Sequence, residues 1–220
     1  MDCPFYGSRR LAVALQVNRK RMQRLMSIMG IEALYPKGNL SRRNPDHEVH
    51  PYLLRDVTVE WADQVWSTDI TYIPMQGGFL YLTAVMDWYS RYVLSWEISN
   101  TMETRFCVDA LQSAFAWGCP EIFNTDQGSQ FTSAAFQEPL KERKIRISMD
   151  GRGRCLDNVF IERLWRSLKY ELIYPGDFAS GLDLWRALEG YFDFYNRRRP
   201  HQALGYKTPA DLYLSRAKPT

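Results

Sequence analysis

The sequence predicts an α/β fold in which helices flank a mixed sheet of about five strands. Three apolar segments between residues 64 and 98 are separated by short turns, which indicates an antiparallel meander. After residue 104, segments with helical spacing alternate with short apolar runs, the pattern of strands connected through helices. A basic segment with helical spacing precedes this region, so we expect a small N-terminal helical part.

The first 34 residues predict two short helices. An apolar side around Leu11 indicates the first, and Asn18 is placed to cap a second helix over residues 19–29. Apolar residues recur in the second helix at i, i+3, i+4 and i+7, which predicts a core-facing stripe of Met22, Leu25, Met26 and Met29. A basic second helix is typical of helix-turn-helix DNA readers. A plain helical hairpin with a solvated basic side is the alternative.

Charge is unevenly distributed along the chain. Residues 1–44 carry nine Lys and Arg against two acids, a net charge of +7, and the remainder carries 19 against 23, a net charge of −4, which together give +3. A basic N-terminal segment followed by a mildly acidic remainder suggests electrostatic binding to nucleic acid. The same composition would also arise from a solvated surface without a partner.

Composition also excludes some classes of protein. No apolar run approaches the roughly 18 residues of a membrane span, and no signal peptide opens the chain, so we expect a soluble cytoplasmic protein without membrane contact. The four cysteines lie far apart without metal-ligand spacing, which indicates reduced thiols. His47 and His50 have no cysteine pair at a suitable distance, so zinc is not favoured.

Four regions are expected. Residues 1–34 form the basic segment, and residues 35–60, which contain several prolines and no periodicity, form an exposed linker. Residues 61–176 form the core, and residues 177–220 form a helix and a basic tail packed on it. Within these regions we expect strands at 64–74, 79–87, 90–98, 121–125 and 145–148, and helices at 104–117, 132–143, 157–169 and from 178 onward. This is the element order of ribonuclease-H-like cores.

Three acidic residues stand where a charge is unexpected. Asp69 lies inside the first strand, Asp126 follows the fourth, and Glu162 lies on a predicted helix. A single such aspartate is ordinarily a hydrogen-bonded or exposed strand residue. If the first and fourth strands are neighbours, however, the carboxylates converge, and each ionised pair about 4 Å apart repels by roughly 4 kcal/mol. Such a cluster needs cations, and hard oxygen ligands favour Mg²⁺ or Mn²⁺, typically two ions.

The predicted helix at 157–169 also carries groups suited to a phosphodiester backbone. Asn158, Glu162, Arg166 and Lys169 share one helical face. The alternative is an ordinary exposed face joined by a Glu162–Arg166 pair. In the loop before the helix, Gly151 and Gly153 alternate with Arg152 and Arg154, which is typical of a mobile lid beside a site.

The C-terminal region predicts a helix that packs on the core, followed by a basic cluster. Its apolar stripe comprises Leu182, Trp185, Leu188, Tyr191, Phe192 and Tyr195. Arg197, Arg198 and Arg199 follow, and His201 and Tyr206 lie nearby, which favours a contact with the DNA backbone. A solvated cluster that complements the helix dipole is the alternative.

Several long stretches resemble the catalytic, OrfB-type subunit of bacterial insertion-sequence transposases, the DDE class with an integrase catalytic core. They are residues 66–73, 124–131, 157–169, 195–210, 6–10 and 17–21. The resemblance implies a ribonuclease-H-like fold, Mg²⁺-dependent cleavage of element ends, and strand transfer by the freed 3′ hydroxyl through two-metal-ion phosphoryl transfer. Its acidic triad would be Asp69, Asp126 and Glu162, acting as catalytic and metal-binding residues.

The resemblance also implies partners. We expect double-stranded DNA (element ends and target), a homo-oligomer assembled on DNA, and an upstream-frame product with a helix-turn-helix and leucine zipper, in a bacterial cytoplasm near the nucleoid. The residues expected to bind nucleic acid are Arg9, Arg10, Arg19, Lys20, Arg21, Arg24, Arg152, Arg154, Asn158, Arg166, Lys169, Arg197, Arg198 and His201.

Two features depart from the family pattern. The segment between Arg10 and Val17 is shorter than the usual helix-turn-helix spacing, and Cys155 stands where an aromatic residue is common. Two alternatives to a transposase therefore stay open: a non-catalytic remnant that binds DNA ends, and a ribonuclease-H-like nuclease that hydrolyses DNA without joining it.

Overall fold

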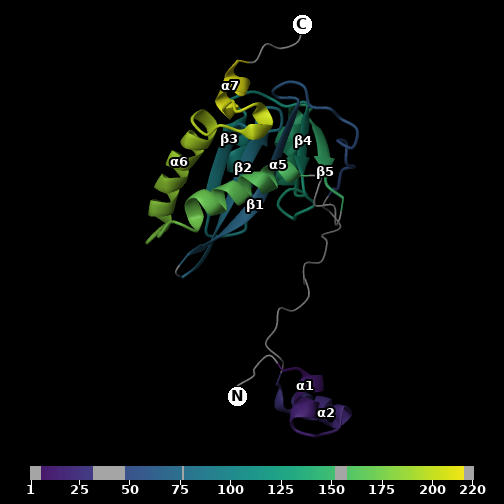
Figure 1. Ribbon diagram of the computed structural model, residues 1–220. Helices are drawn as coiled ribbons and strands as arrows, with labels where there is room; N and C mark the ends of the chain where they lie inside the picture. The colour runs from purple at the N-terminus through teal and green to yellow at the C-terminus, as the bar shows by residue number, and fades with distance from the viewer. Residues whose placement is uncertain (1–5, 32–47, 76, 152–157, 216–220) are drawn as a thin grey trace. The chain divides into compact units, whose positions relative to one another are not determined.

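The computed structural model describes residues 6–31, 48–75, 77–151 and 158–215 (Figure 1). The chain divides into two compact units, Met1–Arg42 and Arg43–Thr220. Arg152, Arg154 and Cys155 lie outside the described residues, and so do residues 35–47 of the expected linker. The expectation that the linker is exposed is wrong for its described part, because Leu54 is 5% exposed and packs in a core cluster with Val65. Among the described helices, none is both long and apolar enough to cross a membrane.

The N-terminal unit contains helices α1 (Ser8–Ala14) and α2 (Arg19–Met29). The predicted cap is confirmed, since the side chain of Asn18 accepts a hydrogen bond from the Lys20 N–H at 2.9 Å. Gly30 ends α2 with a φ of 64°, which glycine adopts without steric cost. The expectation of a wholly core-facing stripe is wrong: Met22 is buried, but Leu25 and Met29 are 37% and 56% exposed. Two short helices have too few neighbours to cover the whole stripe.

In the second unit, the described residues form one five-stranded sheet with the order β3-β2-β1-β4-β5. The strands are β1 (Val65–Met75), β2 (Gly78–Asp87), β3 (Val93–Ser99), β4 (Ile122–Thr125) and β5 (Arg146–Met149). Strands β1, β2 and β3 pair antiparallel, whereas β1, β4 and β5 pair parallel. The sheet is therefore mixed, and the expected neighbourhood of the first and fourth strands is confirmed.

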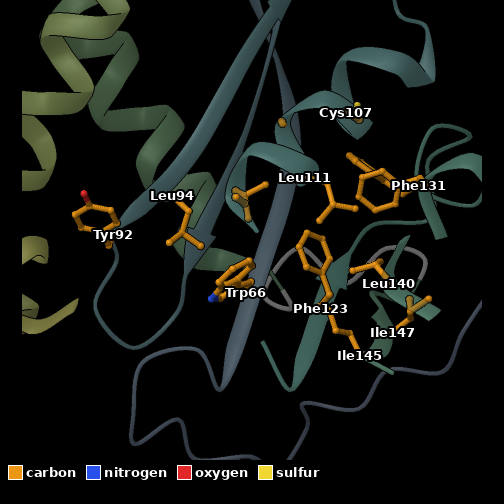
Figure 2. Close-up of a cluster of buried hydrophobic side chains, with 14 of the residues drawn as sticks. Trp66, Tyr92, Leu94, Cys107, Leu111, Phe123, Phe131, Leu140, Ile145 and Ile147 are labelled. Carbon is orange, nitrogen blue, oxygen red and sulfur yellow. The ribbon is translucent and has the colours of Figure 1, made fainter. Parts of the chain in front are cut away.

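Helices cover both faces of this sheet. On one face, α3 (Thr104–Ala114) and α4 (Ala134–Glu142) pack into a core that Figure 2 shows through Leu111, Leu140 and Phe123. On the other face lie α5 (Val159–Leu168) and α6 (Gly181–Arg197) (Figure 1). Their buried apolar residues form one core with those of β1, β2 and β3. The predicted α/β architecture is confirmed, because the helices that follow the meander cover the sheet with their apolar sides. In α6 the expected stripe is only partly buried, since Leu182 and Trp185 are 57% and 39% exposed.

The turn between β2 and β3 shortens the third strand relative to the prediction of residues 90–98. The Asp87 carboxylate accepts hydrogen bonds from the Ser90 N–H at 2.8 Å and from the Ser90 hydroxyl at 2.6 Å. Arg91 adopts a left-handed φ of 64°. These residues form a tight corner, so strand pairing starts only at Val93. Asp87 is fully buried, and burial raises its pKa to about 6.

Two helical elements extend beyond the sequence prediction. The helix expected to end at Lys169 continues as a π-helix, η1 (Lys169–Ile173). The C-terminal segment also forms α7 (Pro209–Leu214), whose Tyr213 is fully buried. The ring of Tyr213 stacks on Tyr92 with centroids 4.8 Å apart, and its hydroxyl donates to Asp63 Oδ1 at 2.7 Å. The end of the chain is thus part of the core and not only a basic tail.

Candidate active site

Asp69 and Asp126 lie on neighbouring parallel strands. The pairing of β1 with β4 joins Val65 with Ile122 and Ser67 with Asn124. The same register, carried two residues further, aligns Asp69 with Asp126. Neighbouring strands lie about 4.8 Å apart, and alternate residues point to the same face. The two aspartates therefore occupy adjacent positions on one face, where β4 ends.

Helix α5 crosses that face and brings Glu162 to the two aspartates. The Trp165 Nε1–H donates to Asp69 Oδ2 at 3.0 Å, and the Asn158 side-chain amide donates to the Thr68 carbonyl at 3.3 Å. These two hydrogen bonds, one from the residue before α5 and one from its second turn, hold the helix over β1. Glu162 lies between them in sequence, less than one turn from Trp165, and its side chain is exposed.

The electrostatics of Asp69 support the proximity of the three acids. Burial raises the pKa of Asp69 to about 6, and the negative charges of Asp126 and Glu162 contribute to the increase. Asp126 remains accessible to solvent, yet the protein atoms packed around it raise its pKa as well. A carboxylate whose pKa is raised by neighbouring negative charge favours a proton or a cation beside it.

The donor set of this cluster fits a hard divalent cation. Mg²⁺ and Mn²⁺ prefer carboxylate oxygens with positions left open for water or phosphate. Across the part of the chain that the structure describes, no three His, Cys, Asp or Glu side chains already stand in metal-coordinating geometry. Asp69 therefore lies near both of the other acids, but the oxygens of the three do not converge on one point.

Two further residues, Gly128 and Trp165, hold the aspartates and are not among the predicted site residues. The Gly128 N–H donates to Asp126 Oδ1 at 2.8 Å, and a Cβ added at Gly128 would lie 2.9 Å from the same oxygen. A side chain at this position would therefore push the carboxylate away. An aspartate two residues before a glycine is typical of a turn closed by the carboxylate, which is a local pattern that could identify Gly128. Trp165, in contrast, reads as an ordinary apolar residue of α5.

The expectation that Asn158 shares an exposed face with Glu162 and Arg166 is wrong. Asn158 is 6% exposed, because it precedes the first turn of α5 and its amide reaches the backbone of β1. It holds the helix to the sheet and does not lie on the surface. Arg166 is exposed and Lys169 is half-buried, so the basic part of the predicted face remains accessible.

The other predicted DNA-contact residues fall into two groups. In the N-terminal unit, every one of them is exposed: Arg9, Arg10, Arg19, Lys20, Arg21 and Arg24. At the C-terminal end of α6, Arg197 and Arg198 are exposed but pair with Asp193 at 3.3 and 3.2 Å. Exposure is the condition for binding DNA, and all of these arginines and Lys20 meet it.

His201 offers no charge to a phosphate at neutral pH. Its ring packs edge-on against Tyr195 with centroids 4.7 Å apart. Burial and the neighbouring Arg199 lower the pKa of His201 to about 4, so the imidazole is neutral near pH 7. Its position is structural, since it lies beside the ion pair between Arg199 and Glu171, whose atoms approach to 2.6 Å.

Comparison with known proteins gives consistent matches over nearly the whole chain. Two models described as "Integrase core domain" match residues 60–155 and 143–209. The transposase of insertion sequence element IS904 from Lactococcus lactis is 33% identical over an alignment 222 residues long. The alignment covers 94% of this chain and 87% of that protein. The putative transposase InsK for element IS150 of Escherichia coli is 32% identical and is covered to 76% of its length.

Solved structures share the fold at lower identity. The HTLV-2 integrase catalytic core in complex with magnesium (dimeric form) superposes with a TM-score of 0.56 at 20% identity, covering 70% of this chain and 97% of that one. A chain of the simian T-cell lymphotropic virus intasome, in complex with the PP2A regulatory subunit B56 gamma, superposes with a TM-score of 0.63 at 19% identity. That match covers 97% of this chain and 77% of the other. The ribonuclease-H-like fold predicted from the element order is therefore confirmed.

Proposed function

Since the chain belongs to the family of bacterial insertion-sequence transposases with an integrase core domain, we propose that it cleaves the ends of its element and joins the freed 3′ hydroxyl to target DNA. Members of this family act in DNA transposition. The observation that carries the proposal is the alignment of Asp69 with Asp126 on adjacent parallel strands, with α5 presenting Glu162 over the same face.

Asp69, Asp126 and Glu162 would hold Mg²⁺ or Mn²⁺ in this proposal. Two such ions supply activation of the attacking oxygen and stabilisation of the leaving oxygen in an in-line displacement at phosphorus. The chain's own contribution is to orient the ligands. Trp165 engages Oδ2 of Asp69, and the Gly128 N–H engages Oδ1 of Asp126. These hydrogen bonds would orient the two carboxylates toward a cation, and the exposed Glu162 side chain would complete the ligand set.

Double-stranded DNA would approach along the exposed side of α5. Arg166 and Lys169 follow Glu162 by one and two turns, and cations there would neutralise phosphates next to the acids. We propose the same role for Arg152 and Arg154 and for the basic residues of the N-terminal unit. Because two DNA ends and a target must meet, we also propose a homo-oligomer on DNA, assisted by an upstream-frame helix-turn-helix product. The expected compartment is the bacterial cytoplasm, near the nucleoid.

A joining assay tests this function. The full chain is incubated with Mg²⁺, a plasmid target and a labelled DNA end that already carries a recessed 3′ hydroxyl. The proposal predicts labelled product joined to the plasmid, with no joining when the 3′ terminus is a dideoxynucleotide. Hydrolysed DNA without joined product would indicate the nuclease alternative, and Mg²⁺-independent binding without either product would indicate the non-catalytic remnant.

A further inference from the structure

Two exposed tyrosines continue the solvent-facing side of α5 beyond the candidate active site. Tyr170 and Tyr174 are 66% and 61% exposed. Their rings meet edge to face, with centroids 5.3 Å apart and planes at 87°. The Arg166 guanidinium lies 5.9 Å from the centroid of the Tyr170 ring. In an edge-to-face pair at least one ring keeps both faces uncovered by its partner, so flat aromatic surface remains available.

The backbone under this tyrosine pair is held firmly. Glu171 lies between the two tyrosines in the π-helix η1, and its carboxylate accepts hydrogen bonds from Arg199 Nε at 3.0 and 3.1 Å and from the Tyr191 hydroxyl at 3.0 Å. Ile173 is buried in the core beneath α6. π-Helical turns occur frequently at functional sites. The two rings are thus exposed although their helix is fixed on both sides.

The tyrosine pair lies at a defined distance from the acids. Tyr170 follows Glu162 by eight residues, which is about 12 Å along a helix axis. That length equals about three to four base steps of duplex DNA. Glu162, Arg166 and Tyr170 recur every four residues, so they line one exposed side of the helix. A strand whose phosphate reacts near Glu162 would therefore pass the tyrosines a few nucleotides away.

We propose that Tyr170 and Tyr174 form a stacking site for unpaired bases of the DNA end, a few nucleotides from the reacting phosphate. The inference rests on the proposed function and adds to it that the bound end is locally single-stranded. Arg166 is exposed beside the Tyr170 ring and attracts a phosphate backbone, which favours a nucleic-acid strand over an apolar protein surface as the occupant. Aromatic rings stack on every base, so the site needs no particular sequence.

The test compares two DNA ligands in the absence of divalent metal, so that binding alone is measured. One ligand is a blunt duplex, and the other carries a four-nucleotide single-stranded extension. Stacking of one base contributes roughly 1–3 kcal/mol, so the double variant Tyr170→Leu/Tyr174→Leu should lose about tenfold in affinity for the extended duplex. Its affinity for the blunt duplex should stay unchanged. Tyr170→Phe/Tyr174→Phe should bind both ligands like the original chain, because the aromatic faces remain.

Phe79→Leu is the matched control, since Phe79 is an equally exposed aromatic residue on β2. It should affect neither ligand. Equal losses on both ligands, or a phenylalanine variant as weak as the leucine variant, would overturn the stacking site. Both outcomes are independent of the acids, because they are read without metal; a failure of the joining assay would instead overturn the proposed function. The melting temperature of each variant verifies that it is folded.

Discussion

Asp126→Asn is expected to reduce both cleavage and joining by about a thousandfold or more, while DNA binding persists. A bound divalent ion contributes several kcal/mol of charge stabilisation to the transition state, and each 1.4 kcal/mol corresponds to tenfold in rate. Asparagine keeps the shape of the side chain and can still accept the Gly128 N–H, so the turn after β4 should survive. The lost quantity is one negative charge at the proposed metal site. Single-turnover cleavage and joining with Mg²⁺ measure the effect.

Asp109→Asn is the matched control for this substitution. Asp109 is an exposed aspartate on α3, on the opposite face of the sheet, where it pairs with Arg105 at 3.8 Å. An exposed pair of this kind contributes little, so rates should stay close to those of the original chain. Normal joining by the Asp126 variant, or a comparable loss in the Asp109 variant, would remove Asp126 from the chemistry.

Leu164→Ala is expected to lower the free energy of unfolding by about 2–5 kcal/mol. Leu164 is 1% exposed and lies in the core that α5 and α6 form with the sheet. In a domain of 150–250 residues, about 3 kcal/mol corresponds to a decrease in melting temperature of roughly 6–12 °C. Thermal unfolding followed by circular dichroism measures this decrease.

Arg163→Ala is the neighbouring control, because Arg163 lies on the exposed side of the same helix. Its unfolding free energy should change by less than about 0.5 kcal/mol. If Leu164→Ala melted at the same temperature as the Arg163 variant, α5 would not be held by its apolar side. The support of Glu162 would then have to come from Asn158 and Trp165 alone.

Most of the fold can be predicted from the order of helices and strands along the sequence. Three strands in a meander followed by alternating helices and strands leave few ways to place the fourth strand, and its position beside β1 is the one observed. Because strand side chains alternate with period two, the same order also predicts that Asp69 and Asp126 share a face. The adjacent placement of the two aspartates could therefore be predicted from the sequence, since it depends only on register and topology.

Features that depend on tertiary contacts could not be predicted in this way. Asn158 is polar and lies at a helical spacing from Glu162, yet the backbone of β1 provides it with a buried acceptor. Trp165 reads as a core residue, and only the fold shows that its indole N–H meets Asp69. The hydrogen bond from the Asp63 N–H to Asp87 and the burial of Tyr213 likewise depend on partners distant in sequence. Local pattern carries no information about such partners.

The basic C-terminal cluster illustrates the same limit. Arg197, Arg198 and His201 read as a continuous cationic patch, but Asp193 pairs with both arginines, and burial keeps the histidine neutral. Arg199, the remaining member, is engaged by Glu171 of the π-helix. A charge count along the sequence cannot distinguish a cation that is free to bind DNA from one that already has a partner.

The most direct test of the account measures the binding of Mn²⁺ to the full chain by titration calorimetry, in the absence of DNA. If Asp69, Asp126 and Glu162 form one divalent-metal site, the original chain should bind Mn²⁺ and Glu162→Gln should bind it at least about tenfold more weakly, because one carboxylate ligand is lost. Equal Mn²⁺ affinity in the original chain and the Glu162→Gln variant would contradict a metal site built from these three acids.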